Sequence, residues 1–174
     1  MALYRFGERR PTVARGAYVS DSARVIGDVV IGDECYIGHG VILRGDYGCI
    51  RIGPGTAIEE NAVVHIRPDG ISRIGERVTI GHGAVIHGNL IADYAVIGMG
   101  AIICFDAEIG QWCIVGEGCV VTSGQQIPPE KMVVGVPGRI IGDTQQRHKD
   151  FWTYGKQLYV DLTKKYPAEF EKIE

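Results

Sequence analysis

The sequence has no long apolar segment. Its longest apolar run, residues 95–105, spans 11 residues and contains two glycines, which is too short to cross a bilayer. The first ten residues carry several charges and no apolar stretch, so they do not resemble a secretory signal. We therefore expect no association with a membrane.

The sequence also lacks a cysteine framework and an excess of basic charge. Its 5 cysteines are odd in number and form no Cys-x-x-Cys pair, which argues against disulfides and a cysteine zinc site and favours a reducing cytoplasm. With 18 Lys plus Arg against 21 Asp plus Glu, the chain does not have the composition of a dedicated nucleic-acid binder. At 45% hydrophobic residues it is too apolar to be disordered.

What is abundant is glycine, with 25 residues, and a repeat with a period of six. The repeat is clearest in the second half of the chain, where every sixth residue is aliphatic: Ile97, Ile103, Ile109, Val115, Val121, Ile127 and Val133. A small residue often stands two positions earlier, as at Ala101 and Cys113, and glycine commonly follows. Internal repeats of this length are typical of coiled β architectures.

Neither an α-helix nor an alternating strand has a period of six. A coil of short strands joined by tight corners has it, and three hexapeptides would close one coil of about 18 residues. We predict a mainly β fold, a parallel β-helix over residues 1–142, in which Cys113 and Cys119 are small core residues. A slip of three residues between Leu43 and Ile52 marks a departure from the repeat.

Residues 143–174 have a different pattern, which predicts a C-terminal α-helix packed along the outside of the β-helix. The expected helical stripe is Phe151, Gly155, Leu158, Leu162 and Lys165, with Trp152, Tyr159 and Tyr166 beside it. Pro167 is expected to end this helix.

Aligning the coils brings polar residues into columns. Leu43, Val64 and Ile86 occupy equivalent positions in three successive coils, and the residues that follow them are Arg44, His65 and His87. Each follows an inward aliphatic residue and should point outward. Adjacent coils lie about 4.8 Å apart, close enough for the two imidazoles to bind one metal ion.

A second column contains His39, Glu60 and His82, on a different side of the coil. His82 therefore cannot easily reach the other two histidines within one chain, but it could do so across a subunit boundary. A cyclic homotrimer would bring different faces of neighbouring chains together. We predict a metal site at each interface, with His65 and His87 from one chain and His82 from the next.

Three histidine ligands leave one tetrahedral position open, which is the arrangement of a catalytic zinc site. Iron or cobalt would also accept these ligands, so Zn²⁺ is expected, with Fe²⁺ or Co²⁺ as alternatives. The alternative interpretation is that the three histidines are solvated or pack in the trimer without a metal. His39 and His148 fit neither pattern and are given no role.

Three segments together resemble the γ-class carbonic anhydrase-like family of hexapeptide-repeat trimers: Leu43-Arg-Gly-Asp46, Asn61-Ala-Val-Val-His65 and Gly81-His-Gly-Ala-Val-Ile-His87. The resemblance covers nearly the whole chain, including Val134-Gly-Val-Pro-Gly138, a segment that hexapeptide acyltransferases share. It implies a left-handed β-helix, a handedness that periodicity cannot supply and that departs from the usual right-handed crossover.

By the same resemblance, His65, His82 and His87 are the metal ligands. Arg44 is expected to bind Glu60 of the neighbouring subunit, and Asp46 to shape the hydrogen bonds near the metal. A tyrosine of the last helix lines the family's site, and Tyr159 is the best match.

The chain departs from the family pattern at three places. Glu59 stands where the family usually has glutamine, and a carboxylate there could act as a base on water or balance the charge of the metal. Tyr47 stands where the best-studied active form of the family has glutamate. The interval between His65 and His82 lacks the long acidic loop that supplies a proton shuttle in that form. Weak or latent activity would follow from these changes.

The expected function is reversible CO2 hydration, with CO2 and bicarbonate as small-molecule partners and activated water as the nucleophile. The catalytic candidates are Arg44, Asp46, Glu59 and Tyr159. Two alternatives of other classes remain open. One is a hexapeptide acyltransferase or a thioesterase acting on acyl-CoA, and the other is a non-catalytic metal-binding or partner-binding trimer.

Overall fold

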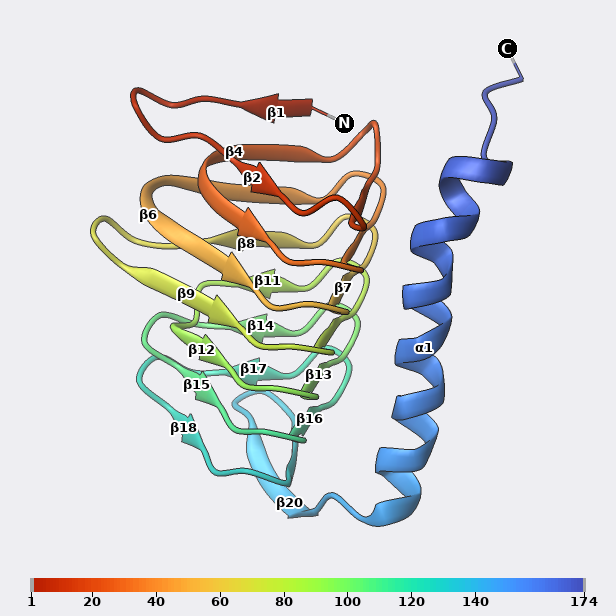
Figure 1. The fold of residues 1–174 in the computed structure, drawn as a ribbon. Coiled ribbons are helices and arrows are strands. Elements are labelled where there is room, and N and C mark those ends of the chain that lie inside the picture. Colours follow the sequence, from red (N-terminus) through yellow and green to blue (C-terminus); the bar gives the residue numbers. More distant parts are fainter. Residues whose placement is uncertain (1, 174) are drawn as a thin grey trace.

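The computed structural model describes residues 2–173, which form a β-helix with one long helix standing beside it (Figure 1). The expected mainly β fold, a left-handed parallel β-helix with a C-terminal helix, is confirmed. The ranges anticipated for the two parts are 1–142 and 143–174. The first residue of the former and the last residue of the latter lie outside the described residues.

Each coil has three sides, which we name faces A, B and C. Face A contains β1 (Ala2–Tyr4), β8 (Val63–His65), β11 (Val85–Ile86), β14 (Ile102–Ile103) and β17 (Val120–Val121). Face B contains β2 (Thr12–Val13), β9 (Ile71–Ile74), β12 (Leu90–Ile91), β15 (Glu108–Ile109) and β18 (Gln126–Ile127). The long strands β4 (Arg24–Ile31) and β6 (Ile42–Ile52) belong to both faces.

Face C is a separate sheet of eight strands. In spatial order they are β3 (Tyr18–Val19), β5 (Tyr36–Ile37), β7 (Ala57–Ile58), β10 (Thr79–Ile80), β13 (Val96–Ile97), β16 (Ile114–Val115), β19 (Lys131–Val134) and β20 (Arg139–Asp143). All pairs are parallel except β19 with β20. The antiparallel β20 closes the last coil and leads into the helix (Figure 1).

The strand register follows the hexapeptide repeat. Ile97 pairs with Val115, Ile103 with Val121 and Ile109 with Ile127. Each pair is separated by three hexapeptides, so the predicted coil length is confirmed. The seven aliphatic residues of the repeat are all buried in one continuous core, and Cys113 and Cys119 lie in that core with 0% exposure. All five cysteines are free thiols.

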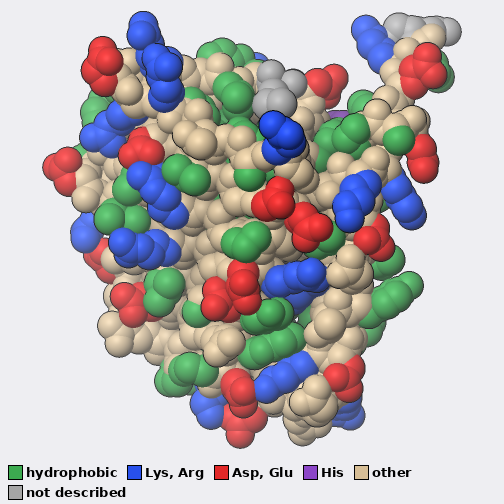
Figure 2. All heavy atoms as spheres, viewed as in Figure 1, with side chains coloured by type: hydrophobic (Ala, Val, Ile, Leu, Met, Phe, Trp, Pro, Cys, Tyr) green, Lys and Arg blue, Asp and Glu red, His purple; other side chains and the backbone are tan. Residues whose placement is uncertain are grey.

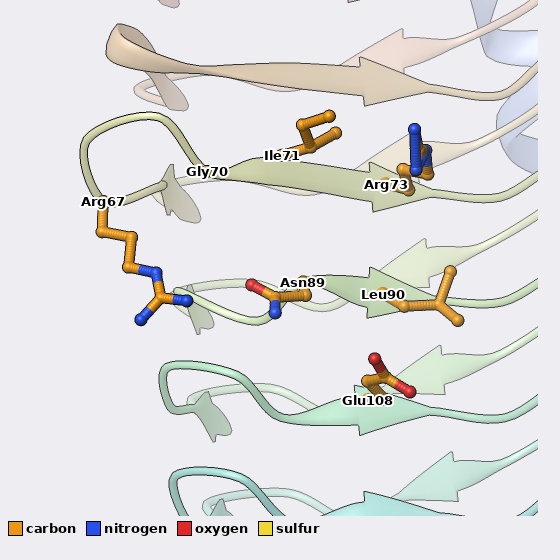
Figure 3. A pocket seen from close by; sticks show the side chains of 7 residues that line it. All are labelled: Arg67, Gly70, Ile71, Arg73, Asn89, Leu90 and Glu108. Atoms are coloured by element: carbon orange, nitrogen blue, oxygen red, sulfur yellow. The ribbon is translucent and has the colours of Figure 1, made fainter.

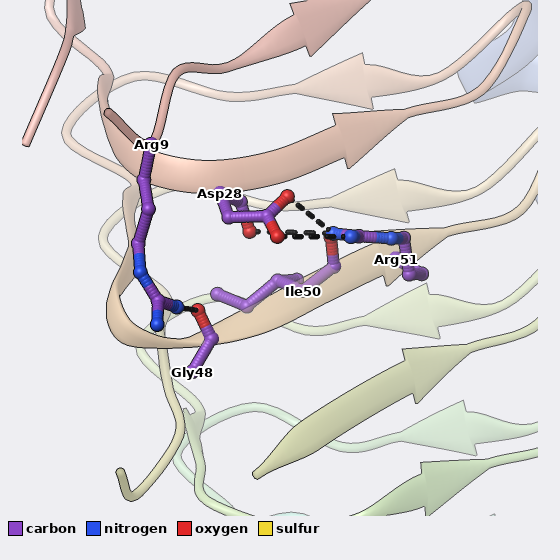
Figure 4. A network of polar contacts seen from close by, with 5 residues as sticks. All are labelled: Arg9, Asp28, Gly48, Ile50 and Arg51. Atoms are coloured by element: carbon purple, nitrogen blue, oxygen red, sulfur yellow. Dashed lines mark hydrogen bonds and ion pairs between the residues drawn. The ribbon is translucent and has the colours of Figure 1, made fainter. Parts of the chain in front are cut away.

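The slip after Leu43 does not produce a loop. Residues Ile42–Ile52 run as one strand, β6, whose first part pairs with β8 and whose last part pairs with β9. Two arginines hold the bend (Figure 4). The guanidinium of Arg51 donates to both carboxylate oxygens of Asp28, at 2.7 and 3.0 Å, and Arg9 donates to the Gly48 carbonyl at 2.9 Å. The extra residues are therefore absorbed by an extended strand that bends around a corner.

The helix α1 (Gln146–Glu169) runs back along face C toward the first coils (Figure 1). Its buried residues are Lys156, Val160 and Thr163, whereas Phe151 and Leu158 of the expected stripe are 67% and 46% exposed. The predicted orientation is therefore wrong. The side of the helix that faces the β-helix is instead the one that carries Tyr159 and Tyr166, because both rings pack on Tyr36 of face C.

The predicted end of the helix is also two residues short. Pro167 lies inside α1, and the helix continues to Glu169, where the Phe170 amide donates to the Tyr166 carbonyl at 3.0 Å. A proline in the last turn removes one amide donor without breaking a long run of hydrogen bonds. Among the described residues, no helix has the combination of length and apolar character that a bilayer crossing requires.

Candidate metal site

The first cluster of predicted site residues lies at the edge between faces A and B. Arg44 of β6 pairs in register with His65 of β8, and Val64 pairs with Ile86, which places His87 one coil further on. The rings of His65 and His87 lie 5.2 Å apart between centroids, at an interplanar angle of 85°. The structure thus brings these two histidines together, in the column that the coil alignment predicts.

Asp46 connects this cluster to Arg44. The Arg44 guanidinium donates to Asp46 Oδ2 at 2.7 Å, and Asp46 Oδ1 accepts from the Tyr47 amide at 3.0 Å and lies 3.5 Å from His65 Nε2. Burial alone would raise the pKa of Asp46, but the hydrogen bond and charge of Arg44 hold it below its usual value. Asp46 is therefore a carboxylate at neutral pH.

The two histidines carry ring nitrogens without partners. His65 Nε2 and His87 Nδ1 are buried and have no hydrogen bond within the described residues. Burial, and secondarily the charge of Arg44, lowers the pKa of both imidazoles. Both rings are therefore neutral, the state that binds metals. Phe105 packs edge-on against His87, at 4.5 Å between centroids.

The second cluster lies at the opposite edge of face A, where the face meets face C. His82 sits between β10 and β11 with glycine on both sides. A Cβ at Gly81 would lie 2.8 Å from the Met99 amide nitrogen, and Gly83 has a φ of +68°. The sharp turn that presents His82 therefore depends on both glycines.

Two carboxylates hold the imidazole of His82. Its Nδ1 lies 2.8 Å from Glu60 Oε2, and its Nε2 lies 3.1 Å from Glu59 Oε2. The Tyr36 hydroxyl donates to the other oxygen of Glu60 at 2.8 Å. Glu60 therefore contacts His82 and Tyr36 of its own chain in this structure, while Arg44 contacts Asp46.

Glu59 and Tyr159 form the inner wall of this cluster. Glu59 is only 6% exposed, and burial raises its pKa, although Tyr159 and His82 act in the opposite direction. Burial and the adjacent Glu59 also raise the pKa of Tyr159, which therefore remains a hydroxyl donor at neutral pH. The structure thus brings together Glu59, which follows β7, His82, which follows β10, and Tyr159 of α1.

The two clusters do not meet within one chain, because the face A strand β11 separates His82 from His87. Among the residues that the structure describes, no three His, Cys, Asp or Glu side chains are placed to hold a metal ion. Any site that uses all three histidines therefore needs a second subunit.

The contacts that orient His82 go beyond the sequence prediction, which pairs Glu60 only with Arg44 of a neighbour and gives Tyr36 no role. The signal was available for Glu60, because it lies in the same column as His82, one coil earlier. No sequence pattern points to Tyr36 or to the ring of Phe105.

The remaining exposed face is of a different kind. Figure 2 views face B, where acidic, basic and apolar side chains are interspersed. A hollow of about 410 Å³ on this face contains none of the predicted site residues (Figure 3); it is lined by Arg67, Gly70, Ile71, Arg73, Asn89, Leu90 and Glu108. Arg67 and Asn89 both bind Asp106 beside it, so this region is accounted for by surface ion pairs and hydrogen bonds.

Comparisons with known proteins find sequence relatives with two different names. No family model matches the sequence. The chain is 33% identical to gamma carbonic anhydrase 2, a mitochondrial protein of Arabidopsis thaliana, over 96% of this chain and 64% of that protein, so it spans less than two thirds of that relative. It is 34% identical to the carnitine operon protein CaiE of Escherichia coli, over 93% of this chain and 83% of that protein.

Among solved structures, a Bacillus cereus protein provisionally named an acetyltransferase superposes with a TM-score of 0.92. It is 29% identical, and the match covers 95% of this chain and 96% of that one. One assignment follows from three findings: the match over the full length of the repeat, the two histidine clusters and the sequence relatives. The chain belongs to the γ-class carbonic anhydrase-like family of hexapeptide-repeat, left-handed β-helix proteins.

Proposed function

We propose that this protein is a metal-dependent, carbonic anhydrase-like lyase that hydrates CO2 reversibly at sites between the subunits of a homotrimer in a reducing compartment such as the cytoplasm. The observation that carries the proposal is the pair of buried, unpartnered ring nitrogens on His65 and His87. A buried polar atom without a partner is costly, and a metal ion would satisfy both rings at once. Zn²⁺ is the ion expected here, because three imidazoles with one open position match a catalytic zinc site, with Fe²⁺ or Co²⁺ as alternatives.

His82 is arranged to complete the site from another chain. Glu60 already holds its Nδ1, and a carboxylate on one ring nitrogen is the usual partner of a metal-binding histidine. Nε2 lies 3.1 Å from Glu59 Oε2 and would coordinate the ion once that carboxylate moves aside. The side chain of His82 is 47% exposed, as expected of a ligand that awaits a neighbouring subunit.

Face A has the surface of an interface. Its outward residues pair in register along five coils and form an aliphatic column: Ile42, Val63, Val85, Ile102 and Val120. Face C is covered by α1. The corresponding column of face B is mixed, with Val30, Arg51, Arg73, Leu90, Glu108 and Gln126. Face A therefore has the strongest hydrophobic reason to be buried by another subunit.

The two edges of face A differ, since one carries His82 and the other carries His65 and His87. Joining unlike edges is a head-to-tail contact, which must close into a ring to remain finite. A ring of three places one complete ligand set at each interface. This geometry supports a homotrimer.

A bound metal ion would supply Lewis-acid activation of water near neutral pH. The chain's own residues would then manage the protons and the geometry. Glu59 Oε2, 3.1 Å from His82 Nε2, would serve as the proton acceptor of the site, and the Tyr159 hydroxyl would donate to this carboxylate. Arg44 keeps Asp46 ionised, so Asp46 Oδ1 beside His65 would accept a hydrogen bond from substrate.

The test is metal analysis combined with stopped-flow CO2 hydration on the purified protein. We expect about one metal ion per chain and hydration that is lost in His65→Ala but retained in His148→Ala, a histidine at the start of α1. A protein that binds zinc stoichiometrically without hydrating CO2 would retain the metal site and refute the lyase. A protein without metal would refute both.

A second function deserves a parallel assay because the Bacillus cereus relative is named an acetyltransferase. An acyltransferase or thioesterase acting on acyl-CoA would bind acetyl-CoA in the metal-free protein and would not require all three histidines. Retention of acetyl-CoA turnover after His65→Ala would favour this alternative. Full metal occupancy without turnover of either substrate would favour a non-catalytic metal-binding trimer.

A further inference from the structure

Lys156 is the only buried lysine among the described residues, with 2% exposure. It lies on the inner side of α1, and its Nζ donates to Thr79 Oγ1 at 3.1 Å and to the Ala95 carbonyl at 3.2 Å. Both acceptors are neutral, and no carboxylate of the described chain lies within ion-pair distance of Nζ. The site therefore satisfies the two N–H groups of an uncharged amine. For an ammonium ion it offers no carboxylate at ion-pair distance, only the ring of Trp152, whose centroid lies 5.8 Å from Nζ.

The surroundings favour the uncharged amine. Burial lowers the pKa of Lys156 to about 7, the charge of Glu59 acts to raise it, and the charge of Arg77 lowers it further. An amine with two N–H groups donated to acceptors keeps a free lone pair. Such an amine is a nucleophile at neutral pH, unlike an exposed lysine.

A small cavity opens beside this amine, between α1 and the corner where faces B and C meet. Its volume is about 200 Å³, and it is lined by Arg77, Tyr94, Thr153 and Lys156. The guanidinium of Arg77 donates one hydrogen bond to Gln157 of α1, at 2.9 Å. Apart from Lys156, every lining side chain carries a hydrogen-bond donor, and Arg77 is a permanent cation. The Tyr94 hydroxyl also lies beside the carboxylate of Glu76, so Arg77 and Thr153 are the donors free for a small anion.

We propose that Lys156 is a carbamylation site that reacts with CO2. The Nζ lone pair forms a bond to the carbon of CO2, a C=O π pair moves onto oxygen, and one amine proton leaves to solvent, so that the product is a carbamate anion and H⁺. The Ala95 carbonyl keeps the remaining N–H, and Arg77 with the hydroxyls of Tyr94 and Thr153 lines the space that the two carbamate oxygens would occupy. A carbamate next to a guanidinium makes the short, charge-assisted hydrogen bonds that stabilise a buried anion.

This reaction uses the same small molecule as the proposed function but needs no metal and no hydration activity. It takes place on the other side of the β-helix coil from face A, so failure of either proposal leaves the other intact. Its consequence is a new negative charge under α1, because an uncharged amine becomes an anion, and the extent of this change follows the CO2 concentration.

The experiment traps the adduct on the intact protein. The protein is equilibrated with ¹³C-bicarbonate and CO2 near neutral pH, alkylated with triethyloxonium, digested and examined by mass spectrometry. We expect a ¹³C-labelled ethoxycarbonyl group on Lys156 and none on the five other lysines, which are partly or fully exposed. Labelling should fall as the pH is lowered below about 7, because the protonated amine does not react.

Two variants sharpen the result. Arg77→Gln should reduce the labelled fraction at limiting CO2 by about tenfold, since it removes one charge-assisted hydrogen bond to the carbamate. Lys164→Gln, at a lysine whose side chain is 73% exposed, should change nothing. The proposal fails if the wild-type chain carries label on its α-amino group but not on Lys156. It also fails if bicarbonate protects Arg77 or shifts Lys156 resonances without any covalent adduct.

Discussion

The imidazole rings of His65 and His87 lie 5.2 Å apart at an angle of 85°, in one column of the β-helix, and each buries a ring nitrogen that has no partner within the described chain. In the proposed metal site this pair supplies two of three ligands. The third, His82, lies at the opposite edge of the same face with its ring held by two carboxylates. The proposal that two subunits share the site leads to the following predictions.

The metal site should be rebuilt by mixing two inactive variants. His65→Ala and His82→Ala should each lose the metal, because each removes one of three ligands from every site. Trimers assembled from equal amounts of the two should regain about one quarter of the sites, since a site with all ligands needs an intact edge from each kind of chain. Metal content after co-expression, measured by elemental analysis, checks this. Mixtures that stay metal-free would show that the ligands do not come from different chains.

Glu60 should set the affinity for the metal without being a ligand. Glu60→Gln removes the carboxylate 2.8 Å from His82 Nδ1, so the ring is held less firmly, and metal affinity should fall by about 10- to 100-fold. Competition with a chromogenic chelator measures the change. Glu117→Gln, at an exposed corner, is the matched control and should bind metal as the wild type does. Equal affinities for the two variants would remove Glu60 from the site.

Face A should be the surface through which subunits associate. Ile102→Glu places a charge in the middle of its aliphatic column, at a residue that is 39% exposed in the single chain, and should shift the protein toward monomers. Ile71→Glu makes the same change on face B at 41% exposure and should leave the assembly intact. Sedimentation velocity distinguishes the two. An assembly disrupted by Ile71→Glu but not by Ile102→Glu would place the interface on face B.

Strand β9 offers a matched test of the core. Ile74 is 2% exposed and Ile71 is 41% exposed, three residues apart on the same strand. Ile74→Ala should lower the free energy of unfolding by about 2–5 kcal/mol because it leaves a cavity in a close-packed coil. Ile71→Ala should change it by less than about 0.5 kcal/mol. Urea unfolding of the two variants gives the comparison, and similar losses would contradict the inward direction assigned to Ile74.

The burial of Lys156 should make stability depend on pH. The pKa of its amine falls from 10.5 to about 7 on folding, so between these values the unfolded chain binds a proton that the folded chain lacks. Stability should therefore rise with pH through this window. Lys156→Met should lose this rise, so its stability profile should diverge from that of the wild type between these pH values, and it should be more stable than the wild type at the acidic end. Urea unfolding in CO2-free buffer measures this, and parallel profiles would contradict the shift.

Much of the architecture was accessible from residue spacing. In a β-helix each residue pairs with a residue one coil away, so a fixed period converts directly into columns, and His65 and His87 could be placed together by counting. The side of α1 that faces the β-helix could not be predicted in this way. Its apolar residues are distributed over several faces, and the choice of the inner one was made by Tyr36 and by the acceptors Thr79 Oγ1 and the Ala95 carbonyl, which lie far away in the sequence.

The period of six alone thus specifies coil length, inward aliphatic positions and the columns that carry the histidines, because these depend only on pairing between adjacent coils. The folded chain decides everything that depends on contacts between distant segments. These include the continuous strand β6 in place of a loop, the two carboxylates on His82, and the burial of Lys156 under α1. Such contacts arise when the helix returns along face C, and no local repeat encodes which side chains it will meet.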